Sequence, residues 1–318
     1  MPLATLWLDR PDGTALYVRH WQGDAAPRAV LMLAHGMAEH AGRYARLAEA
    51  LVAAGFAVYA HDQRGHGLTG ERSVLGHFAD HDGWARVVDD LAGLNHHIRQ
   101  AHPQLPIILL GHSMGSYIAT AYLMQHSCSV QGAVLSGSNY QPRTLYRVAR
   151  LIARLESWRQ GPLGRSALLA WLSFGSFNRA FTPARTAYDW LSRDADEVDR
   201  YIADPLCGAR CTNQLWLDLL AGLQQITPVA SLAQIDQALP LLIIGGACDP
   251  VSQGTRLQHL ADALRSAGHT RTDLRVYPEA RHELFNELNR DAVTADLIAW
   301  LEHILPAPAQ PTPQGNAQ

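Results

Sequence analysis

The amino-acid sequence predicts an α/β protein with a mainly parallel central sheet, helices on both faces and an inserted helical cap. Two observations lead to this prediction. Short apolar runs of strand length alternate with longer helical stretches before residue 139 and after residue 214. The stretch between them is too long for a loop and lacks a strand of the core type. With 318 residues, 47% of them hydrophobic, the chain can bury one large core.

These observations divide the chain into four segments. We expect residues 1–138 and 215–305 to form two parts of one core, and residues 139–214 to form the cap. The last segment, residues 306–318, is rich in proline and polar residues and is predicted to be disordered.

Each predicted strand is a short run rich in apolar residues. In the first part of the core we place strands at residues 15–21, 29–34, 57–60, 107–110 and 132–136. Helices are predicted between them at about residues 44–54, 83–102 and 116–124. In the second part, strands at residues 239–244 and 273–277 flank a helix at residues 253–267. The alternation of strand and helix predicts parallel strands, whose carboxyl ends share one edge where a site is expected.

A candidate nucleophile lies in the turn after the strand at residues 107–110. The pentapeptide Gly111-His112-Ser113-Met114-Gly115 joins this strand to a helix, and in that context a sharp turn presents a serine hydroxyl. The glycines let neighbouring backbone approach where a Cβ atom would collide. The plain alternative is an ordinary strand-to-helix turn that contains two glycines and a serine. We interpret Ser113 as the nucleophile.

An acid and a histidine follow Ser113 in the chain order that this arrangement requires. Asp249 comes just after the strand at residues 239–244, and His282 lies in the loop after the strand at residues 273–277. Because Asp249 precedes Pro250 and a helix, a helix-capping role is its alternative. The other histidines after Asp249 lie in helical patterns or before the last strand: His259, His269 and His303. We therefore predict a triad of Ser113, Asp249 and His282.

Acyl transfer also needs hydrogen-bond donors for the oxyanion. The segment His35-Gly36-Met37-Ala38-Glu39-His40 follows the strand at residues 29–34. The backbone N–H groups of Met37 and Met114 are therefore the predicted pair of donors. The alternative is a glycine turn in which His35 serves only for packing.

The cap contains a predicted amphipathic helix with a basic face. Its apolar residues recur at intervals of three and four, and its arginines fall on the opposite face: Leu145, Val148, Ile152 and Leu155 against Arg143, Arg147, Arg150 and Arg154. Residues 139–187 hold eight arginines and one acid, Glu156. One interpretation is that the cap approaches an anionic interface or head group. The other is a helix that packs its apolar face over the sheet and leaves the arginines in solvent.

Composition argues against several classes of protein. A net charge of −3 lacks the basic character of nucleic-acid binders, so we expect no nucleic-acid partner. The chain has no lysine, which excludes Ser–Lys dyads, Schiff-base chemistry and Walker-type nucleotide binding. Its histidines and four cysteines lack the spacing of zinc or redox motifs, so we predict no metal and treat the cysteines as structural.

The expected location is the cytoplasm. The amino terminus lacks a basic region followed by an apolar stretch, and no segment approaches the roughly 20 apolar residues of a spanning helix. We also expect that the basic cap can contact a membrane surface transiently. The oligomeric state is not predicted.

Together, these motifs resemble those of the monoacylglycerol lipase and lysophospholipase branch of the α/β-hydrolases. The resemblance rests on residues 35–40 with Arg43-Tyr44, on His61-Asp62-Gln63-Arg64-Gly65-His66-Gly67, on the turn at Ser113, and on the Asp249 and His282 loops. It spans about residues 10–305 and is looser between residues 140 and 215. It departs at Ser116, where relatives often carry glycine. It implies the α/β-hydrolase fold and hydrolysis of single-chain lipid esters without a metal or organic cofactor.

The resemblance also suggests residues that contact the substrate. Glu39, His40 and Arg43 are candidates for supporting the oxyanion loop or for touching a glycerol moiety. We add three neighbours of the expected nucleophile and oxyanion loop as candidate contacts: His35, Gly36 and His112.

The predicted function is that of a serine carboxylic-ester hydrolase for monoacylglycerols or lysophospholipids, acting through an acyl-enzyme. An S33-type aminopeptidase and a general short-chain esterase use the same triad and remain alternatives, as does a binding protein that has kept the fold. A haloalkane- or epoxide-directed enzyme would carry aspartate in place of Ser113 and is disfavoured.

Overall fold

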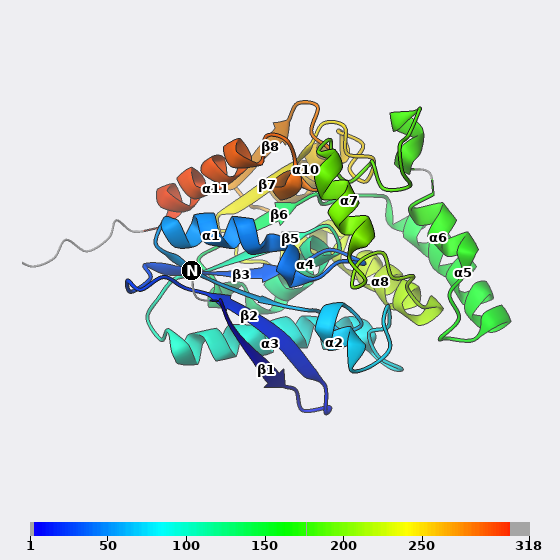
Figure 1. The fold of residues 1–318 in the computed structure, drawn as a ribbon, viewed down its shortest axis with the longest axis horizontal. Coiled ribbons are helices and arrows are strands. Elements are labelled where there is room, and N and C mark those ends of the chain that lie inside the picture. The colour runs from blue at the N-terminus through cyan, green and yellow to red at the C-terminus, as the bar shows by residue number, and fades with distance from the viewer. Residues whose placement is uncertain (1–2, 176, 306–318) are drawn as a thin grey trace, which may run out of the picture.

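An eight-stranded sheet runs through the centre of the molecule (Figure 1). The computed structural model describes residues 3–175 and 177–305, so the predicted disorder of residues 306–318 concerns residues outside those described. The strands are β1 (Leu3–Asp9), β2 (Ala15–Trp21), β3 (Ala29–Ala34), β4 (Phe56–His61), β5 (Ile107–His112), β6 (Gly132–Ser136), β7 (Leu241–Gly246) and β8 (Thr272–Tyr277). Their order is β1-β2-β4-β3-β5-β6-β7-β8. β2 pairs antiparallel with β1 and β4, and the other pairs are parallel.

Helices cover both faces of this sheet. They are α1 (Ala45–Ala53), α2 (Gly67–Glu71), α3 (Gly83–Ala101), α4 (Met114–His126), α5 (Arg143–Gln160), α6 (Ala167–Ser173), α7 (Ala195–Ala203), α8 (Asn213–Ile226), α9 (Val229–Leu232), α10 (Arg256–Ser266) and α11 (Arg290–Ile304). Alternate residues of β3 enter two hydrophobic clusters, one shared with α3, α4, α8 and α10 and the other with α1 and α11. Both faces of β3 are therefore buried, which explains why its sequence is apolar throughout.

Most predicted elements are confirmed, and three strands, β2, β3 and β6, have the predicted bounds. β1 was not predicted: this edge strand exposes most of its residues, and its longest apolar run is only the three residues Leu6-Trp7-Leu8. The predicted strand at residues 239–244 begins and ends two residues too early, because β7 spans Leu241–Gly246. Pro240 has no N–H to donate, so pairing begins at Leu241, whose N–H donates to Arg271, and continues through Gly246.

Between β6 and α8 the chain leaves the sheet. The described residues of this stretch form α5, α6 and α7 and a short 3₁₀ helix at Phe177–Phe181, with no strand of the sheet among them. In Figure 1 these green helices lie at one end of the sheet. We therefore propose the division expected from the sequence, with residues 139–214 as a cap on a core of residues 1–138 and 215–305.

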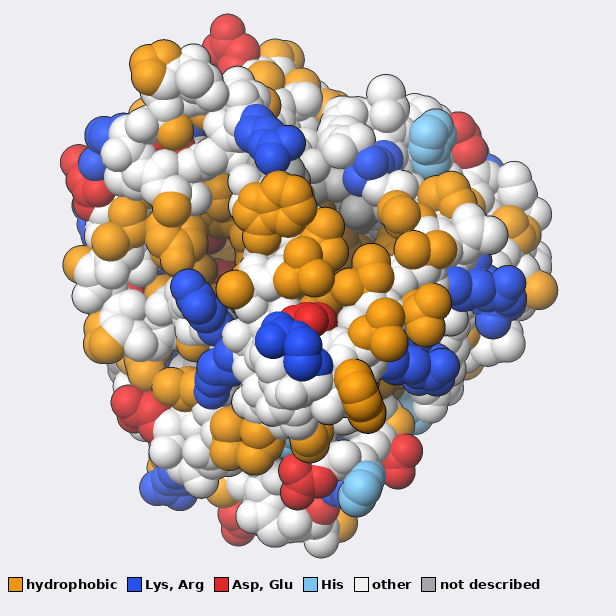
Figure 2. All heavy atoms as spheres, turned by 90° about the vertical axis from the view of Figure 1, so that its right-hand side faces the viewer, with side chains coloured by type: hydrophobic (Ala, Val, Ile, Leu, Met, Phe, Trp, Pro, Cys, Tyr) orange, Lys and Arg blue, Asp and Glu red, His pale blue; other side chains and the backbone are white. Residues whose placement is uncertain are grey.

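The expectation that α5 packs its apolar face over the sheet is wrong. α5 packs instead on α8, and its own buried residues are Tyr146, Ala153 and Glu156. The apolar face of α5 lies in solvent, together with part of α6: Leu145, Val148, Leu151, Leu155, Trp158, Leu168, Trp171 and Leu172 are exposed. Figure 2 faces this side of the molecule and shows hydrophobic side chains gathered there with arginines among them.

Polar anchors on the buried face explain this orientation of α5. The Glu156 carboxylate accepts hydrogen bonds from Ser166 Oγ at 2.5 Å, from Arg159 Nη2 at 2.7 Å and from Gln160 Nε2 at 2.9 Å. The Glu156 backbone carbonyl accepts from Asn213 Nδ2 at 3.3 Å, at the start of α8. A buried carboxylate needs such hydrogen-bond partners, and the orientation of α5 that supplies them turns its leucines outward.

No helix among residues 3–175 and 177–305 has the length and hydropathy to cross a bilayer.

Candidate active site

Ser113 occupies a strained turn between β5 and α4. Its backbone angles are φ +50° and ψ −119°, a conformation that L-residues rarely adopt. The turn is held by hydrogen bonds from Ser113 N–H to the Ser136 carbonyl at 2.8 Å, and from Ser116 N–H to the Ser113 carbonyl at 2.9 Å. Strain of this kind at an exposed hydroxyl is typical of a catalytic serine.

The two glycines of the pentapeptide are required by close backbone packing. A Cβ atom on Gly111 would lie 2.4 Å from the Gly115 carbonyl oxygen, and one on Gly115 would lie 2.1 Å from the Ala34 carbonyl oxygen. Both distances are far below van der Waals contact and involve backbone, which cannot move aside cheaply. The sharp turn therefore depends on glycine at both positions.

Asp249 and His282 lie side by side at the same edge of the sheet. His282 Nδ1 is 3.1 Å from Asp249 Oδ1, and both side chains are almost fully buried. Asp249 follows β7, and its Oδ1 also accepts a hydrogen bond from Val251 N–H at 2.8 Å. His282 and Ser113 line one cavity, although the described residues show no hydrogen bond between them. Such contacts often tighten only when substrate binds.

Burial and charge act in opposite directions on His282. Burial alone would lower the pKa of His282, but the Asp249 carboxylate and the more distant Glu283 and Glu39 raise that pKa above its usual value. The rings of Trp190 and His112 lie 5.2 Å and 4.8 Å from the His282 ring. Burial and the nearby His282 hold the pKa of His112 well below normal, so His112 packs as a neutral ring.

The charge of Glu283 should be visible in the pH dependence of the reaction. A base must be neutral to accept a proton, so kcat/KM is expected to fall as the pH drops through the pKa of His282. Glu283→Gln removes a charge that favours the imidazolium, and the acid limb of the profile should shift to lower pH. The same change at the exposed Glu302 should leave the limb in place. An unshifted limb in the Glu283 variant would contradict this account.

The loop after β3 passes close to Ser113. Met37 lines the cavity, and Met114 is the first residue of α4, where N–H groups have no acceptor within the helix. The positive end of the α4 dipole also favours a developing oxyanion. Gly36 is needed here, since a Cβ atom on it would lie 2.6 Å from Glu39 Oε1 and 3.3 Å from Ser113 Cβ.

Glu39 supports this loop from within. Its Oε1 accepts hydrogen bonds from Gly36 N–H at 2.5 Å and from Tyr44 OH at 2.8 Å. Arg43 Nε lies 3.7 Å from Glu39 Oε2, and Arg43 Nη2 lies 2.5 Å from Glu283 Oε2. Burial and the neighbouring Glu283 raise the pKa of Glu39 to about 7 despite the Arg43 charge. Arg43 thus joins the oxyanion loop to the loop that carries His282.

The structure separates the predicted substrate contacts into two groups. Gly36, Glu39 and His112 line the cavity with Ser113 and His282. His35 does not line it: its Nε2 accepts from Gln63 N–H at 2.9 Å, and its Nδ1 lies 2.8 Å from the Gly36 carbonyl. The His35 ring therefore holds the backbone at Gln63 and Gly36 in place and does not face the cavity.

The cavity has a volume of about 180 Å³ and is lined by two kinds of residue. Its polar lining residues come from the end of β5, from the loops after the strands, from α7 and from other parts of the cap: Glu39, His112, Ser113, Tyr188, Tyr201, Arg210, His282 and Glu283. Its large apolar side chains come from the cap and α8: Phe174, Trp190, Leu191 and Trp216. The arrangement can hold a molecule with one polar end and one apolar end.

Several lining residues were missed by the sequence analysis. Tyr201, Trp190 and Trp216 lie in stretches without a recognisable motif, and no local pattern marks them as parts of the cavity. Glu283 was detectable in principle, because an acid directly follows the predicted catalytic histidine.

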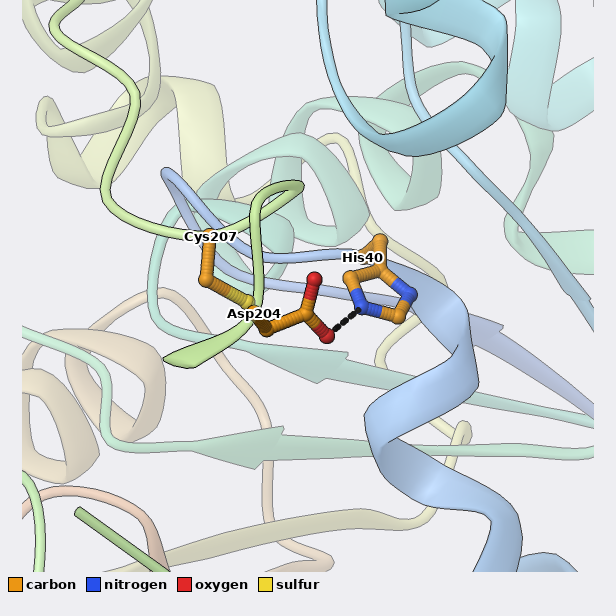
Figure 3. Close-up of side chains that lie close together, drawn as sticks. All are labelled: His40, Asp204 and Cys207. Carbon is orange, nitrogen blue, oxygen red and sulfur yellow. Dashed lines mark hydrogen bonds and ion pairs between the residues drawn. The ribbon is translucent and has the colours of Figure 1, made fainter. Parts of the chain in front are cut away.

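His40, Asp204 and Cys207 form a cluster whose side chains are of the types that bind metal ions (Figure 3). Their ligand atoms lie within 4.8 Å of one another. However, His40 Nδ1 accepts from Gly42 N–H at 3.1 Å, which places the ring proton on Nε2, 2.8 Å from Asp204 Oδ2. A metal on Nε2 would move that proton to Nδ1, where it would face the Gly42 N–H. Burial raises the pKa of Cys207 to about 12, which keeps the thiol protonated. The residues therefore fit a hydrogen-bonded link better than a metal centre.

Comparison with known proteins adds a family context to this geometry. The family described as serine aminopeptidase, S33, matches residues 25–289 of the chain. Monoacylglycerol lipase from Mycolicibacterium smegmatis is 34% identical over 289 residues, which cover 88% of this chain and 90% of that protein. Monoglyceride lipase from Mus musculus is 31% identical over 304 residues, which cover 93% of this chain and 89% of that protein.

Solved structures share the fold. A carboxyl esterase from Bacillus coagulans in complex with glycerol superposes with a TM-score of 0.88 at 24% identity, covering 96% of this chain and 99% of that chain. A soluble variant of monoglyceride lipase from Saccharomyces cerevisiae in complex with a substrate analog gives 0.73 at 20% identity, covering 96% and 97%. These likenesses confirm the predicted α/β-hydrolase fold.

Proposed function

This chain belongs to the serine aminopeptidase S33 family of α/β-hydrolases and is a serine ester hydrolase, and on this basis we propose that it cleaves esters of single-chain lipids. The substrates in question are monoacylglycerols or lysophospholipids. The named relatives are monoacylglycerol lipases, and they support the first of these two classes.

The observation that carries the proposal is the mixed lining of the cavity, which combines polar and large apolar residues. The acyl chain fits the apolar side chains of Phe174, Trp190 and Trp216, where burial of each methylene contributes about 0.8 kcal/mol. The ester and its polar head fit the polar lining residues, among them Ser113 and Glu39. A single chain with one polar end uses both kinds of surface.

The proposed mechanism is acyl transfer in two steps. His282, oriented by Asp249, accepts the Ser113 proton as Oγ attacks the ester carbonyl, and the Met37 and Met114 N–H groups stabilise the oxyanion. Collapse of this intermediate releases the alcohol, which takes the proton from His282, and leaves an acyl-enzyme. Water, deprotonated by His282, then attacks the acyl carbonyl and releases the carboxylic acid and free Ser113.

An aminopeptidase activity is the second candidate, because the family description names it. An aminopeptidase must bind a free ammonium group near the scissile bond, and buried carboxylates are the natural partners. Glu39 and Glu283 line the cavity, but both lie against the Arg43 guanidinium, at 3.7 Å and 2.5 Å. Arg43 balances one of these two negative charges, and a pKa of about 7 leaves Glu39 only partly charged near neutral pH. Little net negative charge then remains, which favours an uncharged polar head over an ammonium group.

A matched substrate panel tests the proposal. It contains monoacylglycerols of several chain lengths, lysophosphatidylcholine, short p-nitrophenyl esters and an amino-acid amide. We expect the highest kcat/KM for monoacylglycerol or lysophosphatidylcholine, rising with chain length until the apolar lining is filled. A preference for the amide would contradict the proposal and support an aminopeptidase. A preference for the shortest esters would support a general short-chain esterase.

The exposed apolar face of α5 and α6 supports contact of the cap with an anionic lipid surface. Single exposed leucines are ordinary, but a contiguous apolar patch of this kind marks an interaction surface. The exposed arginines around it, including Arg147 and Arg154, suit anionic head groups. Ala170 and Phe174 of the same region line the cavity, so a lipid substrate would have a short path from such a surface.

Vesicle binding tests this contact. Leu151→Ser combined with Leu155→Ser should weaken binding to vesicles that contain phosphatidylglycerol by about tenfold or more, since two leucines lose their apolar partner. Hydrolysis of a soluble short ester should not change. Leu288→Ser, at an exposed leucine outside the cap, is the control. Equal binding by the double variant, or no binding by the wild type, would rule out the contact.

A further inference from the structure

The oxyanion loop contains a residue in an unfavourable conformation. Ala38, which follows the proposed donor Met37, has φ +57°, in the left-handed region. This conformation costs an alanine about 1–2 kcal/mol relative to the right-handed region. Ala38 therefore needs contacts elsewhere in the fold that hold it there.

Those contacts come from the cap. The Ala38 carbonyl oxygen accepts a hydrogen bond from Tyr201 OH at 2.9 Å and a second from Gly208 N–H at 2.8 Å. Both donors lie in residues 201–208, at the end of α7 and in the loop that follows. The two lone pairs of this carbonyl are thus both used, and the peptide between Ala38 and Glu39 is fixed in orientation.

A third hydrogen bond joins the same two segments. His40 Nε2–H donates to Asp204 Oδ2 at 2.8 Å, and Asp204 Oδ1 accepts from Leu206 N–H at 2.9 Å (Figure 3). The Arg43 guanidinium lies 4.8 Å from the centre of the Tyr201 ring. The cap segment thus contacts the oxyanion loop at residue 38 and again at residue 40.

We propose that residues 201–208 act as a clamp that positions the oxyanion loop, with Tyr201 and Asp204 as its positioning residues. The inference rests on the proposed function, because it concerns the Met37 N–H group as an oxyanion donor. If Ala38 were released, it would relax toward the right-handed region, and the peptide between Met37 and Ala38 would turn with it. That turn would displace Met37 itself, whose N–H is the proposed donor. The cap would then determine the rate of the chemical step as well as the shape of the cavity.

Tyr201→Phe is the direct test, because it removes the hydroxyl and keeps the ring. We expect kcat to fall about tenfold, less than the 10²–10³-fold typical when an oxyanion donor itself is lost, with KM changed less than about twofold. A boronic acid that forms a tetrahedral adduct with Ser113 should bind more weakly by the same factor. A non-cleavable ether analogue of the substrate should bind as before.

Tyr140→Phe is the matched control. Tyr140 OH donates to the Thr227 carbonyl at 2.8 Å, so the same substitution removes the same kind of bond at a distance from the cavity. Its kcat and boronic-acid affinity should equal those of the wild type. If Tyr201→Phe raised KM with kcat unchanged, Tyr201 would be a substrate contact and the clamp would be wrong.

Asp204 gives an independent second test. The clamp needs an acceptor for His40 Nε2–H and no charge, so Asp204→Ala should lower kcat while Asp204→Asn retains most of it. Equal loss in both variants would contradict the clamp. Ser113→Ala separates the two proposals: activity in that variant would refute the serine mechanism, whereas wild-type kcat in Tyr201→Phe beside an inactive Ser113→Ala would refute only the clamp.

Discussion

Replacing Ser113 by alanine is expected to lower kcat for ester hydrolysis by about 10⁴ to 10⁶, with little effect on folding. The substitution removes only the hydroxyl group. In its absence water must attack the ester directly, without a covalent intermediate and without a nucleophile held in position beside the carbonyl. The turn itself should persist, because its hydrogen bonds involve the Ser113 backbone and its glycines are unchanged.

Hydrolysis kinetics and labelling together measure this effect. A fluorophosphonate probe should label the wild type and leave Ser113→Ala unlabelled, while thermal unfolding of the two proteins coincides. Ser266→Ala, on the exposed side of α10, is the matched control and should be labelled and active. If Ser113→Ala kept most of its activity, or if the wild type resisted the probe, the assignment of Ser113 would be wrong.

Replacing Asp249 by alanine is expected to have the second largest effect, a loss of about 10⁴ in kcat. Asp249 Oδ1 lies 3.1 Å from His282 Nδ1, and its charge is the largest influence that raises the pKa of His282 against burial. Without it, the buried imidazolium formed during attack would lack a counter-charge.

The asparagine variant separates charge from shape at this position. Asp249→Asn keeps an oxygen that can accept from Val251 N–H and from His282, but it removes the charge. We expect most of the loss to remain and the acid limb of kcat/KM to move to lower pH. The helix-capping alternative does not hold, because α10 begins at Arg256 and its N-cap is Thr255. Near-wild-type activity in either variant would leave Asp249 only the role of holding the turn after β7 through Val251 N–H.

The fold was largely predictable because most of its strands, from β3 to β7, are buried on both faces. A strand such as β3 must be apolar at every position, and such a run can be recognised directly in the sequence. β1 lies at the edge of the sheet and exposes most of its residues, so its formation depends on pairing with β2 and left no such signal. The turn at Ser113 was also predictable, because the two close backbone approaches require glycine at fixed positions.

The orientation of the cap could not be predicted in the same way. The spacing of the leucines in α5 establishes an apolar face but says nothing of what that face meets. The anchors of Glu156 at Ser166 and Asn213 decide it, and they join residues that only the fold brings together. The role of His35 is a similar case, because its ring nitrogens are occupied by backbone groups rather than by the cavity.

The sequence by itself determined the fold class, the family and the identity of the proposed triad, because each depends on short-range patterns in which residue type and spacing carry the chemistry. The tertiary structure alone decided which residues surround Ser113 and how the oxyanion loop is held. Ala38 and Tyr201 are 163 positions apart, and the sequence around neither residue indicates the hydrogen bond between them. Contacts of this kind arise from packing of whole elements, so they become visible only when the chain has folded.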